Sequence, residues 1–291
     1  MPYVIFLIVV FIWTSSFILM KRSLDAFGPL SVGGWRVLGG GVVMMIFWLL
    51  SRRKWPFTRA HLPHLIVIAV INYIVPFVIQ PYIIRLYDSA FMGMMIAFVP
   101  ILTVVVSVPL LRSYPTRRQF AGVLGGLACM GLLLADSLSH DVKVSHFLVA
   151  LIVPFTYAFS NTYVKSRLPT VPPLALAAVC LTAGGLALIP AGLITEPVVV
   201  DDTFPMALTS LILLAVFCTG VAAHLFFKLI QDHGPLFAGM VAYLIPLGAI
   251  GWGALDGEPV TALQIVAIIG VFLMVAIVQI GTTKPTPAVP H

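Results

Sequence analysis

The chain consists almost entirely of long apolar segments, separated by short connectors that carry charged residues, proline and glycine. The hydrocarbon core of a bilayer is about 30 Å thick, and a helix of about 20 apolar residues crosses it. Lipid cannot satisfy exposed backbone polar groups, and these runs are too long and too uniformly apolar for barrel strands. The sequence therefore predicts an all-α polytopic membrane protein with ten transmembrane helices. The segments fall at about residues 3–20, 32–50, 62–84, 89–111, 119–135, 144–164, 172–194, 206–230, 235–255 and 261–280.

The composition excludes a soluble domain. Sixty per cent of the residues are hydrophobic and only 9% are charged, against roughly 45–50% and about 25% in soluble proteins. The net charge of +6 is expected to anchor loops at the membrane surface rather than to bind nucleic acid. The expected surroundings are the lipid bilayer, with no nucleic-acid partner.

The distribution of lysine and arginine predicts the orientation, because cytoplasmic loops carry more of both. With the amino terminus in the cytoplasm, most basic residues fall on the cytoplasmic side. Both termini are therefore expected to be cytoplasmic, in a multi-pass protein of the inner (plasma) membrane. The cytoplasmic basic residues are Arg52, Arg53, Lys54, Arg59, Arg112, Arg117, Arg118, Lys165, Arg167, Lys228 and Lys284, and the outer ones are Lys21, Arg22, Arg85 and Lys143.

The two halves of the chain resemble each other at an offset of about 145 residues. Residues 1–140 are predicted to form a first five-helix repeat, and residues 141–291 a second repeat with a short cytoplasmic tail. Because five is odd, the second repeat starts on the opposite side of the membrane and is inverted. Inverted repeats are typical of secondary transporters, which bind substrate near the midplane between the repeats. Matched pairs include Ser16 and Ser160, Lys21 and Lys165, Pro100 and Pro246, and Gly125 and Gly270.

Several motifs resemble the EamA-type transporters of the drug/metabolite transporter superfamily over the whole chain. Residues 11–17, Phe-Ile-Trp-Thr-Ser-Ser-Phe, followed by Lys21 are similar to the family's first span. Trp35-Arg36 at the start of the second span and the mid-span prolines Pro100 and Pro246 also fit the family. The resemblance implies an exporter of amino acids and other metabolites, and within the family the aromatic amino acid exporters are the most similar.

Polar and aromatic side chains on one face of a span are the candidates for lining a substrate path. Trp13 and Ser16 share a face of the first span, and Tyr157 and Ser160 are their counterparts in the sixth. Asparagine, glutamine and histidine are costly to expose to lipid and should face a cavity or the bundle interior. The predicted substrate-binding residues are Trp13, Ser16, Asn72, Tyr73, Gln80, Tyr82, Phe98, Tyr157, Asn161, His224 and Tyr243.

Alternative roles remain for these residues, since aromatic stripes usually pack helices and serines often bond a neighbouring carbonyl. Arg36 could attract a carboxylate, but the sequence favours a structural role, at the outer interface or at helix ends. Gly122 and Gly126 form a small-xxx-small motif that permits close helix approach, within the chain or across a dimer. Either a monomer or a homodimer is consistent with the sequence.

The sequence predicts a secondary transporter that exports small amphiphilic metabolites, with aromatic and other neutral amino acids as the leading candidates. It would work by alternating access and be driven by the substrate gradient. No ATP-binding loop is present, no cofactor or metal is expected, and no carboxylate lies centrally in a span to carry protons. The alternatives are a proton-coupled exporter of cationic drugs and an intramembrane lipid-modifying enzyme, although no catalytic motif is visible.

Overall fold

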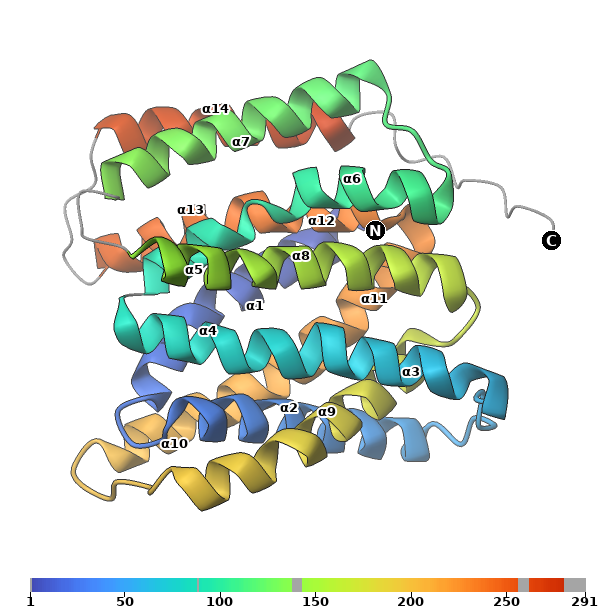
Figure 1. The fold of residues 1–291 in the computed structure, drawn as a ribbon, viewed down its shortest axis with the longest axis vertical. Helices are drawn as coiled ribbons and strands as arrows, with labels where there is room; N and C mark the ends of the chain where they lie inside the picture. Colours follow the sequence, from blue (N-terminus) through green and yellow to red (C-terminus); the bar gives the residue numbers. More distant parts are fainter. Residues whose placement is uncertain (1, 88, 138–142, 256–261, 280–291) are drawn as a thin grey trace.

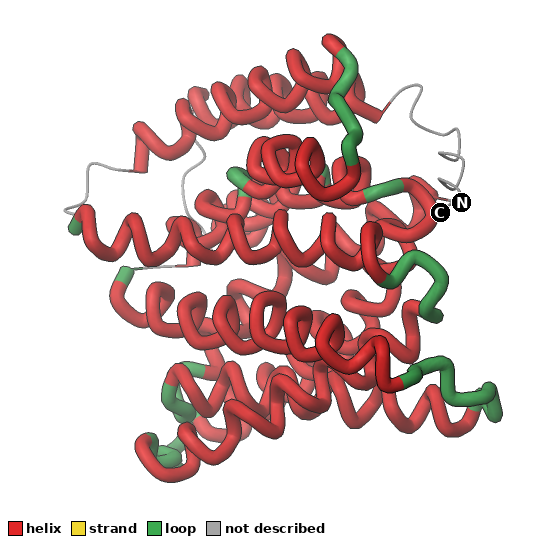
Figure 2. Tube along the Cα trace, turned by 45° about the vertical axis from the view of Figure 1, so that its right-hand side comes forward, coloured by secondary structure: helices red, strands yellow, loops and turns green. Residues whose placement is uncertain are grey.

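The computed structural model describes residues 2–87, 89–137, 143–255 and 262–279, and within these ranges all regular structure is helical. The helices lie side by side in a stack (Figure 1). Most of the described connectors lie at the ends of the helices, on the two sides of the stack (Figure 2). Such an arrangement satisfies backbone hydrogen bonds inside each helix, as a bilayer requires.

In the first half of the chain, each long helix begins close to the start of an apolar segment of the sequence. Proline opens several of these helices, at positions where its missing N–H is not needed. The elements are α1 (Pro2–Ser23), α2 (Pro29–Leu50), η1 (Arg59–His61), α3 (Leu62–Ile68), η2 (Ala69–Ile74), α4 (Val75–Leu86), α5 (Ser89–Ile96), α6 (Val99–Leu111) and α7 (Arg117–Ser137).

The second half follows a similar order. Gly234, with a φ of 89°, makes the sharp turn between α11 and α12 that an L-residue would rarely adopt. The elements are α8 (Val144–Arg167), α9 (Pro173–Thr195), α10 (Phe204–Leu213), η3 (Leu214–Val221), α11 (Ala222–His233), α12 (Pro235–Gly239), α13 (Val241–Leu255) and α14 (Ala262–Gln279).

Seven helical stretches among the described residues are long and apolar enough to cross a membrane. Two shorter apolar helices, Pro235–Gly248 and Ile269–Val278, accompany them. The protein is therefore a multi-pass membrane protein. The seven stretches are Pro2–Ser23, Pro29–Leu50, Arg59–Leu86, Phe91–Leu111, Val144–Arg167, Pro173–Thr195 and Phe204–His233.

Two close helix pairs join the first half of the chain to the second. At one edge of the stack α2 packs along α9, and at the other edge α7 packs along α14 (Figure 1). Glycines make the first contact close: a Cβ on Gly41 would lie 2.7 Å from the hydroxyl of Thr182, and one on Gly185 would overlap the backbone of Leu38. Small residues at such contacts let helix backbones approach each other in a membrane.

The glycines of the small-xxx-small motif in α7 face helices of the same chain. A Cβ on Gly122 would lie 3.1 Å from the carbonyl of Met274 in α14, and one on Gly126 would lie 2.6 Å from the ring of Tyr243 in α13. These two glycines therefore serve packing within the chain.

A carboxylate also links the two halves, where α9 ends and α2 begins. Glu196, which follows α9, accepts hydrogen bonds from the backbone N–H groups of Leu30 (3.0 Å) and Ser31 (2.8 Å). These N–H groups belong to the first turn of α2 and have no partner inside their helix. The negative charge is also favourable at the positive end of the helix dipole.

The interior is built from contacts between the first helix of one half and the interrupted helix of the other. The helix α1 packs against α10, η3 and α11, whereas α8 packs against η2 and α4. The interruptions η2 and η3 are π-helical turns, which begin 145 residues apart, at Ala69 and Leu214. Short π-helical turns often mark functional sites because they displace side chains and free backbone carbonyls.

Candidate functional site

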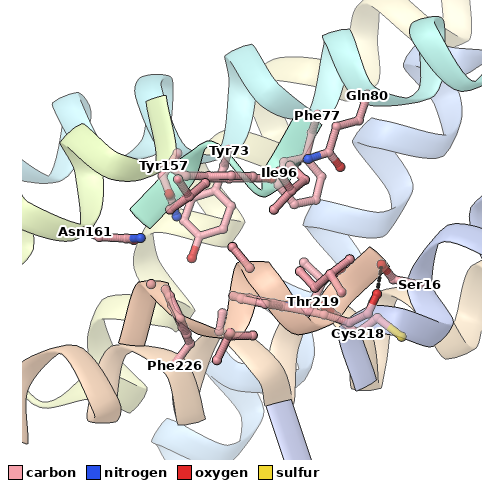
Figure 3. Close-up of a pocket in the computed structure, with 18 of the residues that line it drawn as sticks. Ser16, Tyr73, Phe77, Gln80, Ile96, Tyr157, Asn161, Cys218, Thr219 and Phe226 are labelled. Carbon is pink, nitrogen blue, oxygen red and sulfur yellow. Dashed lines mark hydrogen bonds between the residues drawn. The ribbon is translucent and has the colours of Figure 1, made fainter. Parts of the chain in front are cut away.

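A cavity lies where α1, α2, α8 and the two π-helical turns meet. Together with the open space that adjoins it, the cavity contains about 770 Å³ not filled by atoms, and residues from both halves of the chain line it. Figure 3 shows Gln80, Tyr157 and Asn161 on one wall, and Ser16 and Thr219 on the facing wall. The lining residues are Trp13, Ser16, Phe17, Arg36, Asn72, Tyr73, Phe77, Gln80, Ile96, Val99, Tyr157, Asn161, Cys218, Thr219, Ala223, Phe226, Phe227, Gly239, Val241, Ala242 and Ile245.

The side chain of Trp13 is held by the π-helical turn η3. Its indole Nε1 donates a 3.0 Å hydrogen bond to the carbonyl of Cys218. The Cys218 thiol donates in return to the carbonyl of Ile12 at 3.3 Å. The Trp13 ring also packs against Phe226 of α11, with centroids 4.6 Å apart. An indole needs such a polar partner when buried, and these bonds fix the ring as part of the cavity wall.

On the opposite wall, a hydrogen bond joins the side chains of Gln80 and Tyr157. Nε2 of Gln80 in α4 donates a 2.8 Å hydrogen bond to the phenol oxygen of Tyr157 in α8. Tyr73 and Phe77 lie beside them, with ring centroids 5.9 Å apart. This wall therefore presents aromatic surface together with oriented hydrogen-bonding groups.

Arg36 of α2 lies in the cavity wall. Only 4% of its surface is exposed, so it does not extend to the membrane–water interface. Its Nε donates a 2.8 Å hydrogen bond to the hydroxyl of Thr219, which itself donates to the carbonyl of Leu214 at 2.8 Å. The guanidinium lies over the Phe77 ring, 4.7 Å from the centroid. Nη1 is 3.9 Å from the sulfur of Met20.

Most of the residues predicted from the sequence surround this one cavity. Asn72 is buried, and its Oδ1 has no hydrogen-bond partner. Ser16 donates to the carbonyl of Trp13 at 2.8 Å, so its hydroxyl oxygen keeps an acceptor position. The predicted residues at the cavity are Trp13, Ser16, Asn72, Tyr73, Gln80, Tyr157 and Asn161.

The other four predicted residues do not line this cavity. Tyr82 is 47% exposed and packs edge-on against His146. Tyr243 is fully buried. Its hydroxyl donates a 2.6 Å hydrogen bond to the carbonyl of Val123, so it joins α13 to α7. Phe98 precedes α6 at the edge of the core, and His224 is half-buried with a buried Nδ1 that has no partner.

Sequence reasoning missed part of the wall, including Phe77, Cys218 and Thr219. One signal was available, because Cys218 is equivalent to Tyr73 at the offset of 145 residues. No metal-binding group of three histidine, cysteine or acidic side chains occurs within the described ranges.

A family model described as the EamA-like transporter family matches residues 1–135 and again residues 145–280. A solved crystal structure aligns with a TM-score of 0.76 at 18% sequence identity and covers 96% of both chains, which shows a shared fold.

Curated relatives match along most of their length. The "Uncharacterized inner membrane transporter YedA" of Escherichia coli K12 is 26% identical over 279 residues, which cover 93% of this chain and 88% of the relative. The "Uncharacterized transporter YvbV" of Bacillus subtilis is 25% identical over 94% of this chain and 89% of its own. The "S-adenosylmethionine/S-adenosylhomocysteine transporter" of Chlamydia muridarum is 24% identical over 86% of this chain and 84% of its own.

Proposed function

Because the chain belongs to the EamA-like transporter family, we propose that it exports small amphiphilic metabolites, with aromatic and other neutral amino acids as the leading substrates. The observation that carries the proposal is the cavity between the two halves, whose walls combine aromatic rings with hydrogen-bonding side chains. Trp13 and Tyr157 are equivalent at an offset of 144 residues and are both in these walls. Aromatic faces would bind the apolar part of a substrate, and Gln80 and Asn161 would orient its polar part.

The architecture we propose is ten transmembrane helices in two inverted five-helix repeats, residues 1–140 and 141–291. Two separate matches to one family model support it, as does the recurrence of a π-helical turn at the same place in each half. The distribution of lysine and arginine supports a cytoplasmic location for both termini. Reporter fusions after Leu50, Leu111 and Arg167 should all report the cytoplasm, and a periplasmic signal from any of them would contradict this topology.

The mechanism we propose is alternating access driven by the substrate gradient. A site buried between helices can exchange substrate with each side in turn when the surrounding helices rearrange. Of the described residues that line the cavity, none is a carboxylate that would serve as a proton relay.

A second candidate substrate is S-adenosylmethionine or S-adenosylhomocysteine, which the name of the Chlamydia muridarum relative favours. Both compounds are amino acids that carry a large aromatic nucleoside. The same cavity would bind their amino-acid end and stack the adenine ring against an aromatic wall.

Counterflow in proteoliposomes tests these substrates directly. The purified protein is reconstituted with a high internal concentration of unlabelled compound, and uptake of the labelled compound is followed. The panel contains L-phenylalanine, L-tryptophan, L-leucine, S-adenosylmethionine and a cationic drug such as ethidium. We expect protein-dependent counterflow of the aromatic amino acids. Flux of ethidium alone, stimulated by a proton gradient, would instead support a proton-coupled exporter of cationic drugs.

A further inference from the structure

The guanidinium of Arg36 is a buried charge, and no described carboxylate forms an ion pair with it. The ion pair formed by described residues is Lys228 with Asp232, which is an exposed contact within α11. The contacts of Arg36 are a hydroxyl, a thioether and an aromatic ring. Isolated charges inside a membrane protein are costly and usually mark a functional site.

The contacts of Arg36 also leave hydrogen-bonding capacity unused. A guanidinium has five N–H donors. The structure provides one strong acceptor, the Thr219 hydroxyl at 2.8 Å, and one weak acceptor, the Met20 sulfur at 3.9 Å. Cζ of Arg36 lies over the Phe77 ring, which provides no strong hydrogen-bond acceptor. The remaining donors are therefore available at the cavity, which Arg36 lines.

The position of this charge is fixed by the π-helical turn η3. The Thr219 hydroxyl donates to the carbonyl of Leu214, so its oxygen is oriented to accept from Nε of Arg36. A rigid guanidinium favours planar anions such as carboxylates, because two parallel hydrogen bonds form without further ordering.

The other polar groups of the cavity are neutral, and one of them is an unused acceptor. Oδ1 of Asn72 is buried and has no hydrogen-bond partner. A buried acceptor of this kind is stabilised when a ligand donates to it. The wall of the cavity thus holds one unpaired cation and, buried within the wall, an acceptor without a partner. A carboxylate and an ammonium group would complement these two groups.

We propose that Arg36 is the carboxylate-binding residue of the cavity, and that the substrates are therefore organic acids and zwitterions rather than cations. This inference rests on the proposed transport function and deepens it. Thr219 and Phe77 position the guanidinium, and Asn72 adds an acceptor for the ammonium group of an amino acid. The bound carboxylate would supply the ion-pair partner that no described residue provides for Arg36.

Three related probes separate the charged groups of a substrate. L-phenylalanine carries a carboxylate and an ammonium group, 3-phenylpropanoate carries only the carboxylate, and L-phenylalaninamide carries only the ammonium group. Binding is measured by calorimetry on protein in lipid nanodiscs, and counterflow is measured in proteoliposomes. We expect the two carboxylates to bind at least about tenfold more tightly than the amide, since charge-assisted hydrogen bonds are strong.

Variants then test whether Arg36 causes this preference. Arg36→Met keeps an unbranched, although shorter, side chain and removes the charge, and it should abolish the preference for carboxylates. Arg85→Met makes the same change at an exposed arginine outside the cavity, and it should retain the preference. If Arg36→Met does not fold, Thr219→Val serves as the second variant, and it should reduce the preference by at least about threefold because it releases Nε.

The two assays distinguish failure of this inference from failure of the proposed function. Binding that prefers carboxylates without any counterflow would overturn the transport proposal and support the role of Arg36. Counterflow or binding in which the amide equals phenylalanine, in the parent protein, would overturn the role of Arg36. An unchanged preference in a folded Arg36→Met variant would overturn it as well.

Discussion

Gln80 and Tyr157 belong to different halves of the sequence, yet the amide of Gln80 donates a 2.8 Å hydrogen bond to the phenol of Tyr157 in the cavity wall. We expect Gln80→Ala and Tyr157→Ala each to reduce transport severalfold at normal membrane abundance, because both side chains orient substrate. A contact of about 1 kcal/mol corresponds to about a fivefold change in affinity. Initial rates of counterflow in proteoliposomes provide the measurement.

A double-mutant cycle shows whether the two side chains act together. Gln80→Ala combined with Tyr157→Phe should cost less than the sum of the single changes, because either one already breaks the bond. Tyr163→Phe is the matched control: it removes a phenol from the same helix, where the phenol bonds His64 instead. Additive effects of the pair, or an equal loss in the control, would contradict a shared role at the substrate site.

Trp13 combines a hydrogen bond with ring packing, and substitution can separate the two. Trp13→Phe removes the bond to the Cys218 carbonyl but keeps an aromatic ring beside Phe226. We expect Trp13→Ala to reduce transport severalfold and Trp13→Phe to have a smaller effect. Dose–response curves for L-phenylalanine counterflow measure the difference. If Trp13→Ala transports substrate like the parent protein, the Trp13 side chain only packs helices and does not contact the substrate.

Tyr243 is expected to matter for stability rather than for substrate. Its hydroxyl bonds the Val123 carbonyl, and its ring lies against Gly126. Tyr243→Phe should lower the free energy of unfolding by about 0.5–2 kcal/mol, since it removes a buried hydrogen bond between α13 and α7. Thermal unfolding in detergent measures this loss, and calorimetry should find an unchanged dissociation constant. A large change in the dissociation constant of the substrate, with an unchanged melting temperature, would instead indicate that Tyr243 belongs to the substrate site.

Glu196 is expected to stabilise the start of α2. Glu196→Gln removes the negative charge and one of the two acceptors for the N–H groups of Leu30 and Ser31. We expect a loss of about 0.5–2 kcal/mol, which is typical for a helix amino-terminal contact. Asp202→Asn, in the same connector, is the control and should leave the melting temperature unchanged. Equal melting of both variants would show that the cap contributes nothing.

Transport is expected to continue without a proton gradient. Collapse of the gradient with an uncoupler should leave substrate-driven flux intact, because the described lining residues provide no carboxylate relay. His224 is the remaining candidate carrier, since the reference pKa of histidine is about 6.5. If transport needs no proton carrier, His224→Gln should transport substrate at the same rate as the parent protein. Complete loss of flux under the uncoupler, together with an inactive His224→Gln variant, would point to proton coupling.

Periodicity predicted part of the cavity well because helical spacing determines which side chains share a face. Trp13 and Ser16, and Tyr157 and Asn161, follow that spacing and lie at the cavity. Tyr82 is two residues after Gln80, which turns it about 200° around the helix. It is accordingly exposed while Gln80 is buried.

Other wall residues could not be read from the sequence because their positions depend on contacts between helices. The place of Thr219 depends on the π-helical turn η3, which apolar periodicity does not reveal. Arg36 is near the start of α2, where a snorkelling side chain is a reasonable expectation. The structure instead directs it inward to Thr219 and Phe77. The hydroxyl of Tyr243 likewise finds its partner on a helix about 120 residues away.

The glycine contact between α2 and α9 has a mechanical consequence. Gly41 and Gly185 leave no room for a side chain between the two backbones, so sliding or tilting within this pair meets immediate steric resistance. The pair joins one half of the chain to the other, and so does α7 with α14. Separating the halves would therefore break both of these helix pairs, as well as the contacts of α1 and α8 with the opposite half. In the alternating-access mechanism proposed above, the helices that move to expose the cavity would therefore be groups drawn from both halves, and neither half would move as a separate unit.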